Sequence, residues 1–372
     1  MKKQPLGFVQ ESLSMTYHNQ DVTVIIPSLD PDDRLLRVVE NIRQRGFSDI
    51  VLVNDGSATT NLHYFEEAAD RFGCAVLHHP KNLGKGRALK TAFQWYLENR
   101  RSSIGCVTID GDDQHHPEDI EACVQRMRED GGKSIVLGCR DFSAENVPPK
   151  SRFGNKCTSF VFRTFCGLKV SDTQTGLRVF PNAVIPTMCQ VDGERFEYET
   201  NMLLVCKNKK IPLLEQKIRT IYIDDNSTTH FRPIRDSLRV YGIIIRFFCS
   251  SILSFLIDNA LFNLLFTPFK HLIGADPAVW LATLIARVVS SLFNYTMNRK
   301  AVFKSDAPIR ATVFRYYILC AVQMAVSAGL VWLLSTLLGN GGFLVGLLKI
   351  VVDTLLYFIS FRIQQDWVFR KD

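Results

Sequence analysis

The first half of the chain alternates short apolar runs with longer segments whose apolar residues recur every three or four positions. The short runs, typical of buried strands, lie at 22–26, 49–53, 75–78, 105–109 and 134–137. Three groups between them have helical spacing: Leu35, Val38, Val39 and Ile42; Ala88, Phe93 and Leu97; Ile120, Val124 and Met127. Strands that alternate with helices of this length predict an α/β domain with a mainly parallel sheet.

In the second half, apolar residues fill long segments. These run over 242–266, 279–295, 316–338 and 343–361. Each approaches the length of about 20 residues that a helix needs to cross a bilayer. We therefore expect an all-α transmembrane domain of four helices rather than a soluble helical core.

Four charged residues lie inside these spans, away from the span ends. Asp258 lies on the first span and Arg287 on the second, while Lys349 and Asp353 share the fourth. Charge within the hydrocarbon is costly and normally faces a partner or the interior of a bundle. We expect Asp258 to pair with Arg287 and Lys349 with Asp353, and a path for lipid headgroups is the alternative.

Basic residues gather on one side of the spans. They precede the first span, separate the second from the third and follow the fourth: Arg232, Arg235, Arg239, Arg299, Lys300, Lys304, Arg310, Arg370 and Lys371. The opposite loops have Lys270 and His271 as their only basic residues. Because cytoplasmic loops are rich in Lys and Arg, the first half and both termini are predicted to be cytoplasmic. Residues 1–20 lack the apolar core of a secretory signal.

Oxygen-bearing side chains follow three of the predicted strands. Asp30 and Asp55 follow the first two strands, and Asp110, Asp112 and Gln114 follow the fourth. The carboxyl ends of parallel strands share the edge at which ligands bind. Because alternate residues of a strand point the same way, the last three are expected to face one hard cation. An acidic turn is the alternative, since Asp and Gly are common turn residues.

Five motifs in this half resemble those of family 2 glycosyltransferases, which have the Rossmann-like GT-A fold. They are Ile26-Pro-Ser-Leu-Asp30, Val53-Asn-Asp-Gly-Ser57, Asn82-Leu-Gly-Lys-Gly-Arg-Ala88, Asp110-Gly-Asp-Asp-Gln114 and Asp172-Thr-Gln-Thr-Gly-Leu-Arg178. The similarity extends over about residues 20–235 and is greatest to the polyprenyl-phosphate branch, which includes dolichol-phosphate mannose synthases. One departure is Leu29-Asp30-Pro31, where the family commonly has Asn followed by Glu.

The resemblance implies transfer of a monosaccharide from a UDP- or GDP-linked nucleotide sugar to a polyprenyl phosphate, undecaprenyl or dolichyl, with inversion and with Mg²⁺ or Mn²⁺. The implied nucleotide-sugar residues are Pro27, Asp30, Asp55, Lys85, Asp110, Gly111 and Asp112, and the implied metal ligands are Asp112 and Gln114. The implied catalytic residues are Asp112, Arg140, Arg152 and Arg178. The acceptor phosphate would contact Arg152, Asn155, Arg232 and Arg235, because guanidinium groups bind phosphate oxygens well.

The membrane half is similar to the GtrA-like four-helix family. The resemblance is carried by Asn294-Tyr-Thr-Met-Asn-Arg-Lys-Ala-Val-Phe303 and by Asp366-Trp-Val-Phe369, whose shared ending hints at a duplication of helix pairs. The expected domains are an N-terminal extension (1–20), a GT-A domain (21–228), a juxtamembrane amphipathic segment (229–241), a GtrA-like domain (242–366) and a cytoplasmic tail (367–372).

Composition agrees with this organisation. The net charge of +7 suits anionic lipid, and no motif indicates nucleic-acid binding. Ten cysteines without C-x-x-C pairs favour a reducing compartment over disulfides or zinc. The histidine pairs at 78–79 and 115–116 are expected to be loop residues rather than ligands. A homo-oligomer is compatible with the sequence.

Two other functions are considered. One is a flippase for lipid-linked sugars with an accessory nucleotide-sugar domain. The other is a processive polysaccharide synthase, whose Gln-x-x-Arg-Trp motif is not matched by Gln364-Gln-Asp-Trp367. The complete Asp110-Gly-Asp-Asp-Gln114 run favours an active transferase over an accessory domain.

Overall fold

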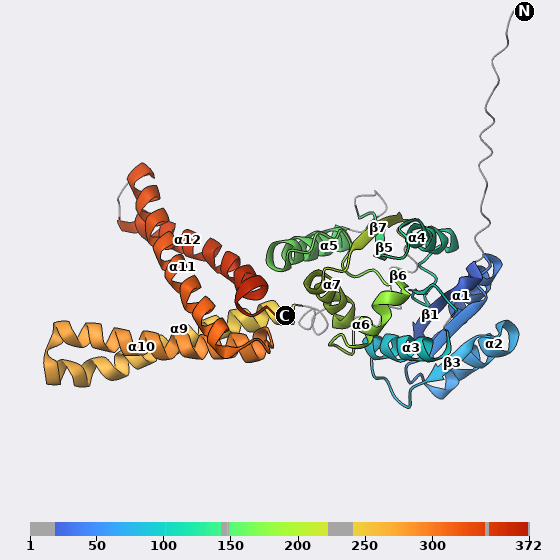
Figure 1. Cartoon of the computed structure of the whole chain (residues 1–372), viewed down its shortest axis with the longest axis horizontal. Coiled ribbons are helices and arrows are strands. Elements are labelled where there is room, and N and C mark those ends of the chain that lie inside the picture. Colours follow the sequence, from blue (N-terminus) through green and yellow to red (C-terminus); the bar gives the residue numbers. More distant parts are fainter. Residues whose placement is uncertain are drawn as a thin grey trace, which may run out of the picture. The chain divides into compact units, whose positions relative to one another are not determined.

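The computed structural model describes residues 19–100, 102–142, 147, 149–221, 241–338 and 342–370 (Figure 1). These residues form two compact units. The first unit lies within 1–141, 175–195 and 211–228, and the second within 142–174, 196–210 and 229–372. Two segments inside the expected 21–228 domain thus group with the membrane helices, and the expected domain bounds stay a prediction.

The first unit contains a sheet of seven strands in the order β3-β2-β1-β4-β6-β5-β7. The strands are β1 (Val22–Ser28), β2 (Asp49–Asn54), β3 (Ala75–His78), β4 (Gly105–Thr108), β5 (Ile135–Arg140), β6 (Arg178–Pro181) and β7 (Leu213–Ile218). Only β6 runs antiparallel to its neighbours, β4 and β5, among these strands. The predicted mainly parallel sheet is confirmed.

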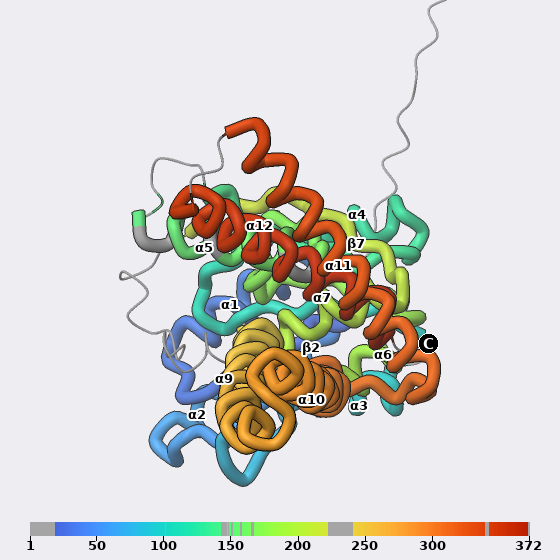
Figure 2. The backbone as a smooth tube through the Cα atoms, turned by 90° about the vertical axis from the view of Figure 1, so that its left-hand side faces the viewer, coloured from blue at the N-terminus to red at the C-terminus, as the bar shows by residue number. Residues whose placement is uncertain are grey.

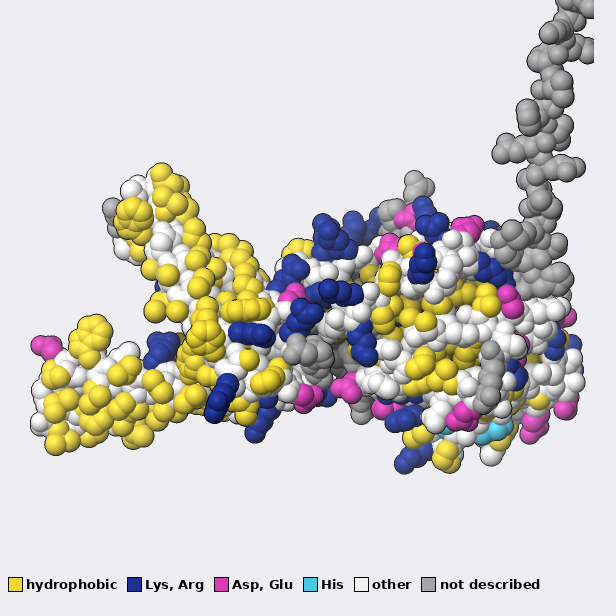
Figure 3. Space-filling view, in the orientation of Figure 1, with side chains coloured by type: hydrophobic (Ala, Val, Ile, Leu, Met, Phe, Trp, Pro, Cys, Tyr) yellow, Lys and Arg dark blue, Asp and Glu magenta, His cyan; other side chains and the backbone are white. Residues whose placement is uncertain are grey.

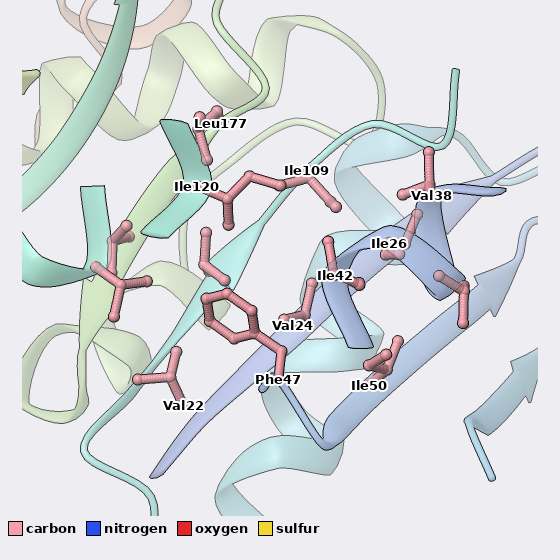
Figure 4. Close-up of a cluster of buried hydrophobic side chains, with 14 of the residues drawn as sticks. Val22, Val24, Ile26, Val38, Ile42, Phe47, Ile50, Ile109, Ile120 and Leu177 are labelled. Atoms are coloured by element: carbon pink, nitrogen blue, oxygen red, sulfur yellow. The ribbon is translucent and has the colours of Figure 1, made fainter. Parts of the chain in front are cut away.

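Helices connect these strands and cover the sheet. They are α1 (Asp33–Gln44), α2 (Leu62–Phe72), α3 (Lys85–Asn99), α4 (Pro117–Glu129) and α6 (Ile185–Cys189), with short 3₁₀ turns η1 (Asn19–Asp21), η2 (Thr59–Asn61) and η4 (Asn182–Val184). Val24 and Ile26 of β1 pack with Val38 and Ile42 of α1 around Phe47 in a buried core (Figure 4). Removing this apolar surface from water holds the helices on the sheet.

The second unit is helical. Its α-helices are α5 (Pro149–Val161), α7 (Glu197–Lys209), α9 (Gly242–Ile273), α10 (Ala275–Met297), α11 (Ile309–Leu338) and α12 (Gly342–Ile363). Three of them continue as π-helices: α5 as η3 (Phe162–Cys166), α10 as η6 (Asn298–Val302) and α12 as η7 (Gln364–Val368). Four of them, α9 to α12, are long and apolar enough to cross a membrane. Apolar side chains cover their outer surfaces (Figure 3).

The membrane helices form two pairs. α9 packs along α10, and α11 packs against α12, as both views show (Figures 1 and 2). In the first pair, Arg287 Nη2 lies 3.2 Å from Asp258 Oδ2. In the second, Lys349 Nζ lies 2.8 Å from Asp353 Oδ2. Both predicted ion pairs within the spans are therefore confirmed.

Buried amide and hydroxyl groups join the two pairs at one end. Asn298 Nδ2 donates to Gln364 Oε1 at 3.0 Å, and Asn298 Oδ1 accepts from Ser250 Oγ. Gln364 Nε2 donates to Ser360 Oγ at 3.0 Å. This network contacts α9, η6, α12 and η7, and its hydrogen bonds satisfy polar groups that would otherwise be costly in an apolar environment.

Both helix pairs end in the same local structure. Each closes with a π-helix whose first carbonyl, Asn298 O or Gln364 O, accepts from the N–H five residues on, Phe303 N or Phe369 N, at 2.8 Å. The rings of Phe303 and Phe369 stack with centroids 5.3 Å apart. These equivalent endings support the duplication of helix pairs read from the sequence.

Candidate active site

Three adjacent parallel strands of the first unit end at one edge of the sheet. In space their order is β2, β1 and β4. Asp55 follows β2, Asp30 lies two residues beyond β1, and Asp110 lies two residues beyond β4. The carboxyl ends of these strands therefore bring the three predicted carboxylates to the same edge.

Asp110 is held by a lysine and a histidine. Lys85 Nζ, at the start of α3, lies 2.6 Å from Asp110 Oδ1, and His115 Nε2 lies 3.7 Å from Asp110 Oδ2. The backbone of Gly176 packs on this carboxylate so closely that a Cβ there would overlap it. Burial acts to raise the pKa of Asp110, but the charges and hydrogen bonds of Lys85 and His115 together outweigh burial and hold the pKa well below its usual range.

Asp112 lies on a turn rather than on a continued strand. β4 ends at Thr108, and Asp113 has a left-handed backbone with φ 65°. The expected strand-like alternation of Asp110, Asp112 and Gln114 is therefore wrong, because the backbone bends at 111–113, as in the alternative of an acidic turn. Asp112 Oδ1 instead accepts from Gln114 N at 3.2 Å. Burial, and then the negative charge of Asp110, raise the pKa of Asp112.

The donors at 112–114 fit a hard divalent ion. Asp112 offers a carboxylate whose raised pKa shows that its negative charge is poorly compensated, and Gln114 offers an amide. No group of three Asp, Glu, His or Cys side chains suited to a metal ion occurs in the described parts of the chain. Mg²⁺ does not require one, since it commonly binds one or two carboxylates and completes its shell with water and substrate phosphates.

Asp55 anchors the loop that leads into α3. Its Oδ1 accepts from Leu83 N at 3.0 Å, and its Oδ2 accepts from Gly84 N at 2.8 Å. His79 Nδ1 lies 2.7 Å from Asp55 Oδ1, and His79 Nε2 lies 2.9 Å from Thr91 Oγ1. Asp55 is 4% exposed and His79 is 9% exposed. The predicted contact of Asp55 with nucleotide stays a prediction, while the structure shows its oxygens bonded to this loop.

Asp30 ties the ends of β1 and β2 together. Its backbone is left-handed, with φ 47°, and its side chain is exposed. Asp30 N donates to Ser57 Oγ at 2.8 Å, and Asp30 Oδ1 accepts from Ala58 N at 2.7 Å. These bonds fix the loop that departs from the family pattern.

Pro27 and Gly111 complete the predicted nucleotide-sugar residues. Pro27 is half-buried on β1. A Cβ at Gly111 would lie 2.8 Å from Ser28 Oγ, so a side chain there would displace the end of β1. The two residues mark a close approach between the ends of β1 and the turn after β4, and their contact with nucleotide sugar stays a prediction.

Comparison with known proteins identifies the family. Residues 23–186 match the family described as glycosyl transferase family 2, and residues 244–369 match the family described as GtrA/DPMS, transmembrane domain. The chain thus contains a glycosyl transferase family 2 domain followed by a GtrA/DPMS transmembrane domain. The four apolar helices belong to that second domain, so the transferase is an integral membrane protein.

The transferase is similar to several curated proteins. An uncharacterized protein of Methanocaldococcus jannaschii is 28% identical over 58% of this chain and 87% of its own length. A UDP-N-acetylglucosamine–dolichyl-phosphate N-acetylglucosaminyltransferase of Methanococcus voltae is 27% identical over 55% of this chain and 86% of its own. An undecaprenyl-phosphate 4-deoxy-4-formamido-L-arabinose transferase of Pseudomonas paraeruginosa is 27% identical over 45% of this chain and 49% of its own.

Two of the predicted catalytic arginines of the transferase belong to the first unit. Arg140 ends β5, and Arg178 begins β6. Arg178 is 1% exposed, and its Nε donates to Thr175 O at 2.9 Å. Thr175 Oγ1 in turn donates to Gly138 O at 2.6 Å. The segment before β6 is thus fixed by its own hydrogen bonds, and the phosphate roles of both arginines stay predictions.

The predicted acceptor residues are Arg152, Asn155, Arg232 and Arg235. Arg152 and Asn155 lie on α5, in the second unit. Asn155 Nδ2 donates to Ser171 O at 3.0 Å, next to the motif that begins at Asp172. Arg232 and Arg235 lie outside the described residues. Binding of the acceptor by these residues stays a prediction.

His79, His115 and Gly176 were not predicted to lie in the site. The histidines lie in loops as expected, but both are buried beside carboxylates of the predicted site, Asp55 and Asp110. The positions of the two histidines in the sequence could have indicated their place in the site. His79 directly follows β3 and His115 directly follows the acidic motif, so both lie where parallel strands end at the ligand-binding edge.

Proposed function

We propose that the transferase moves a monosaccharide from a nucleotide sugar to the phosphate of a polyprenyl phosphate, undecaprenyl or dolichyl, at the cytoplasmic face of the membrane. The observation that carries the proposal is the Lys85–Asp110–Asp112 cluster in a chain that also has four membrane helices. Relatives named for transfer to dolichyl or undecaprenyl phosphate support this acceptor class.

The acceptor phosphate supplies its own nucleophile. A phosphate monoester has a second pKa near 6 and is largely dianionic at neutral pH. One of its oxygens forms a bond to the anomeric carbon of the sugar. The bond from that carbon to the terminal phosphate oxygen of the nucleotide breaks, and its electron pair leaves with the nucleoside diphosphate. Attack opposite the leaving group inverts the anomeric configuration and requires no strong general base.

The larger demand is stabilisation of the departing diphosphate. Lys85 lies at the first position of α3, and a cation at the N-terminus of a helix favours anionic oxygens. Asp112 and Gln114 would hold a divalent ion, Mg²⁺ or Mn²⁺, which neutralises diphosphate charge. The Lys85–Asp110 ion pair fixes the position of the lysine beside these donors.

The distribution of basic residues supports the proposed orientation. Arg299 and Lys300 follow α10, and Arg370 follows η7. Cytoplasmic segments next to membrane helices are enriched in such residues. The first unit would then have access to cytoplasmic nucleotide sugars.

Product analysis tests the proposal. The full-length transferase is incubated with labelled UDP- and GDP-sugars, a polyprenyl phosphate and Mn²⁺ or Mg²⁺, and the products are separated by chromatography. We expect a lipid-linked monosaccharide. A long polymer would indicate a processive synthase, and translocation of a preformed lipid-linked sugar without any transfer would indicate a flippase. Either result would contradict the proposal.

A further inference from the structure

We propose that the membrane helices position the acceptor side of the transferase through a cluster of charged residues at the end of α12. This inference rests on the proposed function and on the prediction that Arg152 and Asn155 of α5 contact the acceptor phosphate. The cluster, called here the membrane-end cluster, consists of Gly167, Lys207, Arg362 and Asp366.

An ion pair joins α7 to the last π-helix. Lys207 Nζ lies 2.7 Å from Asp366 Oδ1, and the two residues are 159 positions apart in the sequence. Their side chains are 23% and 41% exposed. An ion pair this accessible adds little to overall stability. Its consequence is geometric, because it fixes α7 against the end of the fourth membrane helix.

A second contact of the cluster lies at the end of the α5–η3 helix. Gly167 terminates η3 with a left-handed backbone, φ 65°. A Cβ at this position would lie 2.6 Å from Arg362 Nη2 and 3.2 Å from Lys207 Nζ. The missing side chain therefore lets two cationic groups approach the carbonyl end of the helix. That end carries partial negative charge, which favours nearby cations.

The start of the first membrane helix contacts the same α5–η3 helix. Tyr241, directly before α9, has its hydroxyl 2.7 Å from Thr158 Oγ1. Its ring stacks on Phe162, with centroids 6.0 Å apart and planes 26° apart. Phe162 and Thr158 are both buried. The α5–η3 helix is thus held by residues at both ends of the membrane domain's sequence.

These contacts act on the residues assigned to the acceptor. Arg152 and Asn155 lie on α5, and η3 continues the same helix, so fixing Phe162 and Gly167 also fixes the position of α5. The bilayer sets the depth of a lipid headgroup, and attachment to membrane helices would keep the acceptor residues at that depth. The residues assigned to the nucleotide sugar all belong to the other unit. Disturbing the membrane-end cluster should therefore affect the acceptor and leave the donor unchanged.

Charge exchange between Lys207 and Asp366 tests this selectivity. We expect Lys207→Glu and Asp366→Lys each to raise the KM for polyprenyl phosphate severalfold, up to about fivefold, the size that a partly exposed ion pair supports. The KM for nucleotide sugar should stay unchanged. The double variant Lys207→Glu/Asp366→Lys, which restores the pair with reversed polarity, should recover most of the acceptor KM. Lys209→Glu, an exposed site on the same helix, is the matched control.

The proposal is overturned if the single variants behave like Lys209→Glu, if the KM values for both substrates rise together, or if the double variant does not recover the KM for polyprenyl phosphate.

Binding is followed separately by the thermal shift that polyprenyl phosphate causes in the wild type. A wild type with neither transfer nor thermal shift would overturn the proposed function and this inference with it. A wild type that transfers and shifts normally, beside variants that match the control, would overturn this inference alone.

Discussion

At the scale of single residues, the protein around Asp112 disfavours the ionised form of its carboxyl group. Burial and the nearby Asp110 raise its pKa, so the folded protein binds the proton of Asp112 more tightly than the unfolded chain does. Its ionisation therefore lowers the free energy of unfolding as pH rises from the unfolded pKa through the folded one, and the loss persists at neutral pH. Such a cost at a site that fits a cation is expected of a functional residue.

Replacement of Asp112 separates its function from its effect on stability. We expect Asp112→Asn to reduce transfer by at least about 100-fold, the scale of losing one stabiliser of transition-state charge. In EDTA at neutral pH its Tm should equal or exceed that of the wild type, because the repulsion with Asp110 is removed. Asp113→Asn, which changes the neighbouring half-buried turn residue, should retain transfer. A sharply lower Tm for Asp112→Asn would show that the carboxylate is structural.

His79 has an indirect part in the site. It lies between Thr91 and Asp55, and Asp55 holds the loop before α3. We expect His79→Ala to lower Tm and to weaken nucleotide-sugar binding, with a cost of about 1–3 kcal/mol for the hydrogen bond lost by a buried carboxylate. Thr91→Val removes only the hydrogen bond between His79 and Thr91, so it should have a smaller effect on Tm and on nucleotide-sugar binding. Calorimetric titration with the nucleotide sugar measures the binding, and unchanged affinity in His79→Ala would contradict this role.

At the scale of secondary-structure elements, the membrane helices depend on paired charges. Arg287 is 72% exposed on the single chain, and its pairing with Asp258 offsets part of the cost of charge in hydrocarbon. We expect Arg287→Leu to destabilise the protein by up to about 3 kcal/mol, since it removes the positive charge beside the Asp258 carboxylate and leaves that carboxylate a hydrogen bond from the Ser290 hydroxyl. The double variant Asp258→Leu/Arg287→Leu should be less destabilised. Thermal unfolding in one detergent gives the comparison, and a double variant worse than the single would contradict it.

The first turn of α4 is linked to two other elements by Glu118. Hydrogen bonds from Arg219 and then Arg45 lower the pKa of Glu118 to about 2. The resulting stabilisation is present above the unfolded pKa near 4.5 and is lost as pH falls toward about 2. We therefore expect Glu118→Gln to have a slightly lower Tm than the wild type at pH 7 and the difference to shrink from pH 5 to pH 3. A constant difference across this range would contradict the assignment.

The sequence predicted the elements that can be recognised from the residues of a single segment. The parallel strands and the four spans were found because periodicity and apolar length are properties of one segment. β7 escaped because its strand, Leu-Leu-Glu-Gln-Lys-Ile, pairs only with β5 and carries polar residues, and β6 has only four residues. The turn at Asp113 was one of two alternatives, because nothing in the spacing of Asp110, Asp112 and Gln114 distinguishes a strand from a turn.

Contacts between distant segments left no sequence signal. The pairing of Lys207 with Asp366 spans 159 positions, and nothing near either residue predicts it. The same is true of Gly176 against Asp110, which depends on the path of the backbone between β5 and β6. The carboxylates of the site were predictable because each follows a strand. The contacts of His79 and His115 with two of these carboxylates were not, because the sequence does not show which way a side chain points.

At the scale of the whole molecule, a soluble α/β sheet and four membrane helices occur in one chain, and two helical segments from within the transferase half group with the membrane domain. This division suits a reaction with one water-soluble and one lipid substrate. The first unit carries the residues predicted to contact the nucleotide sugar, and α5 carries two of the four residues predicted to contact the acceptor.

In the proposed reaction the anomeric carbon passes from a nucleoside diphosphate to the phosphate of a lipid. Mass spectrometry of the products formed by the full-length protein from a nucleotide sugar and polyprenyl phosphate tests this transfer. We expect a polyprenyl-phosphate monosaccharide and an equal amount of nucleoside diphosphate. Release of nucleoside monophosphate with a pyrophosphate-linked lipid, or of nucleoside diphosphate without any lipid product, would contradict it.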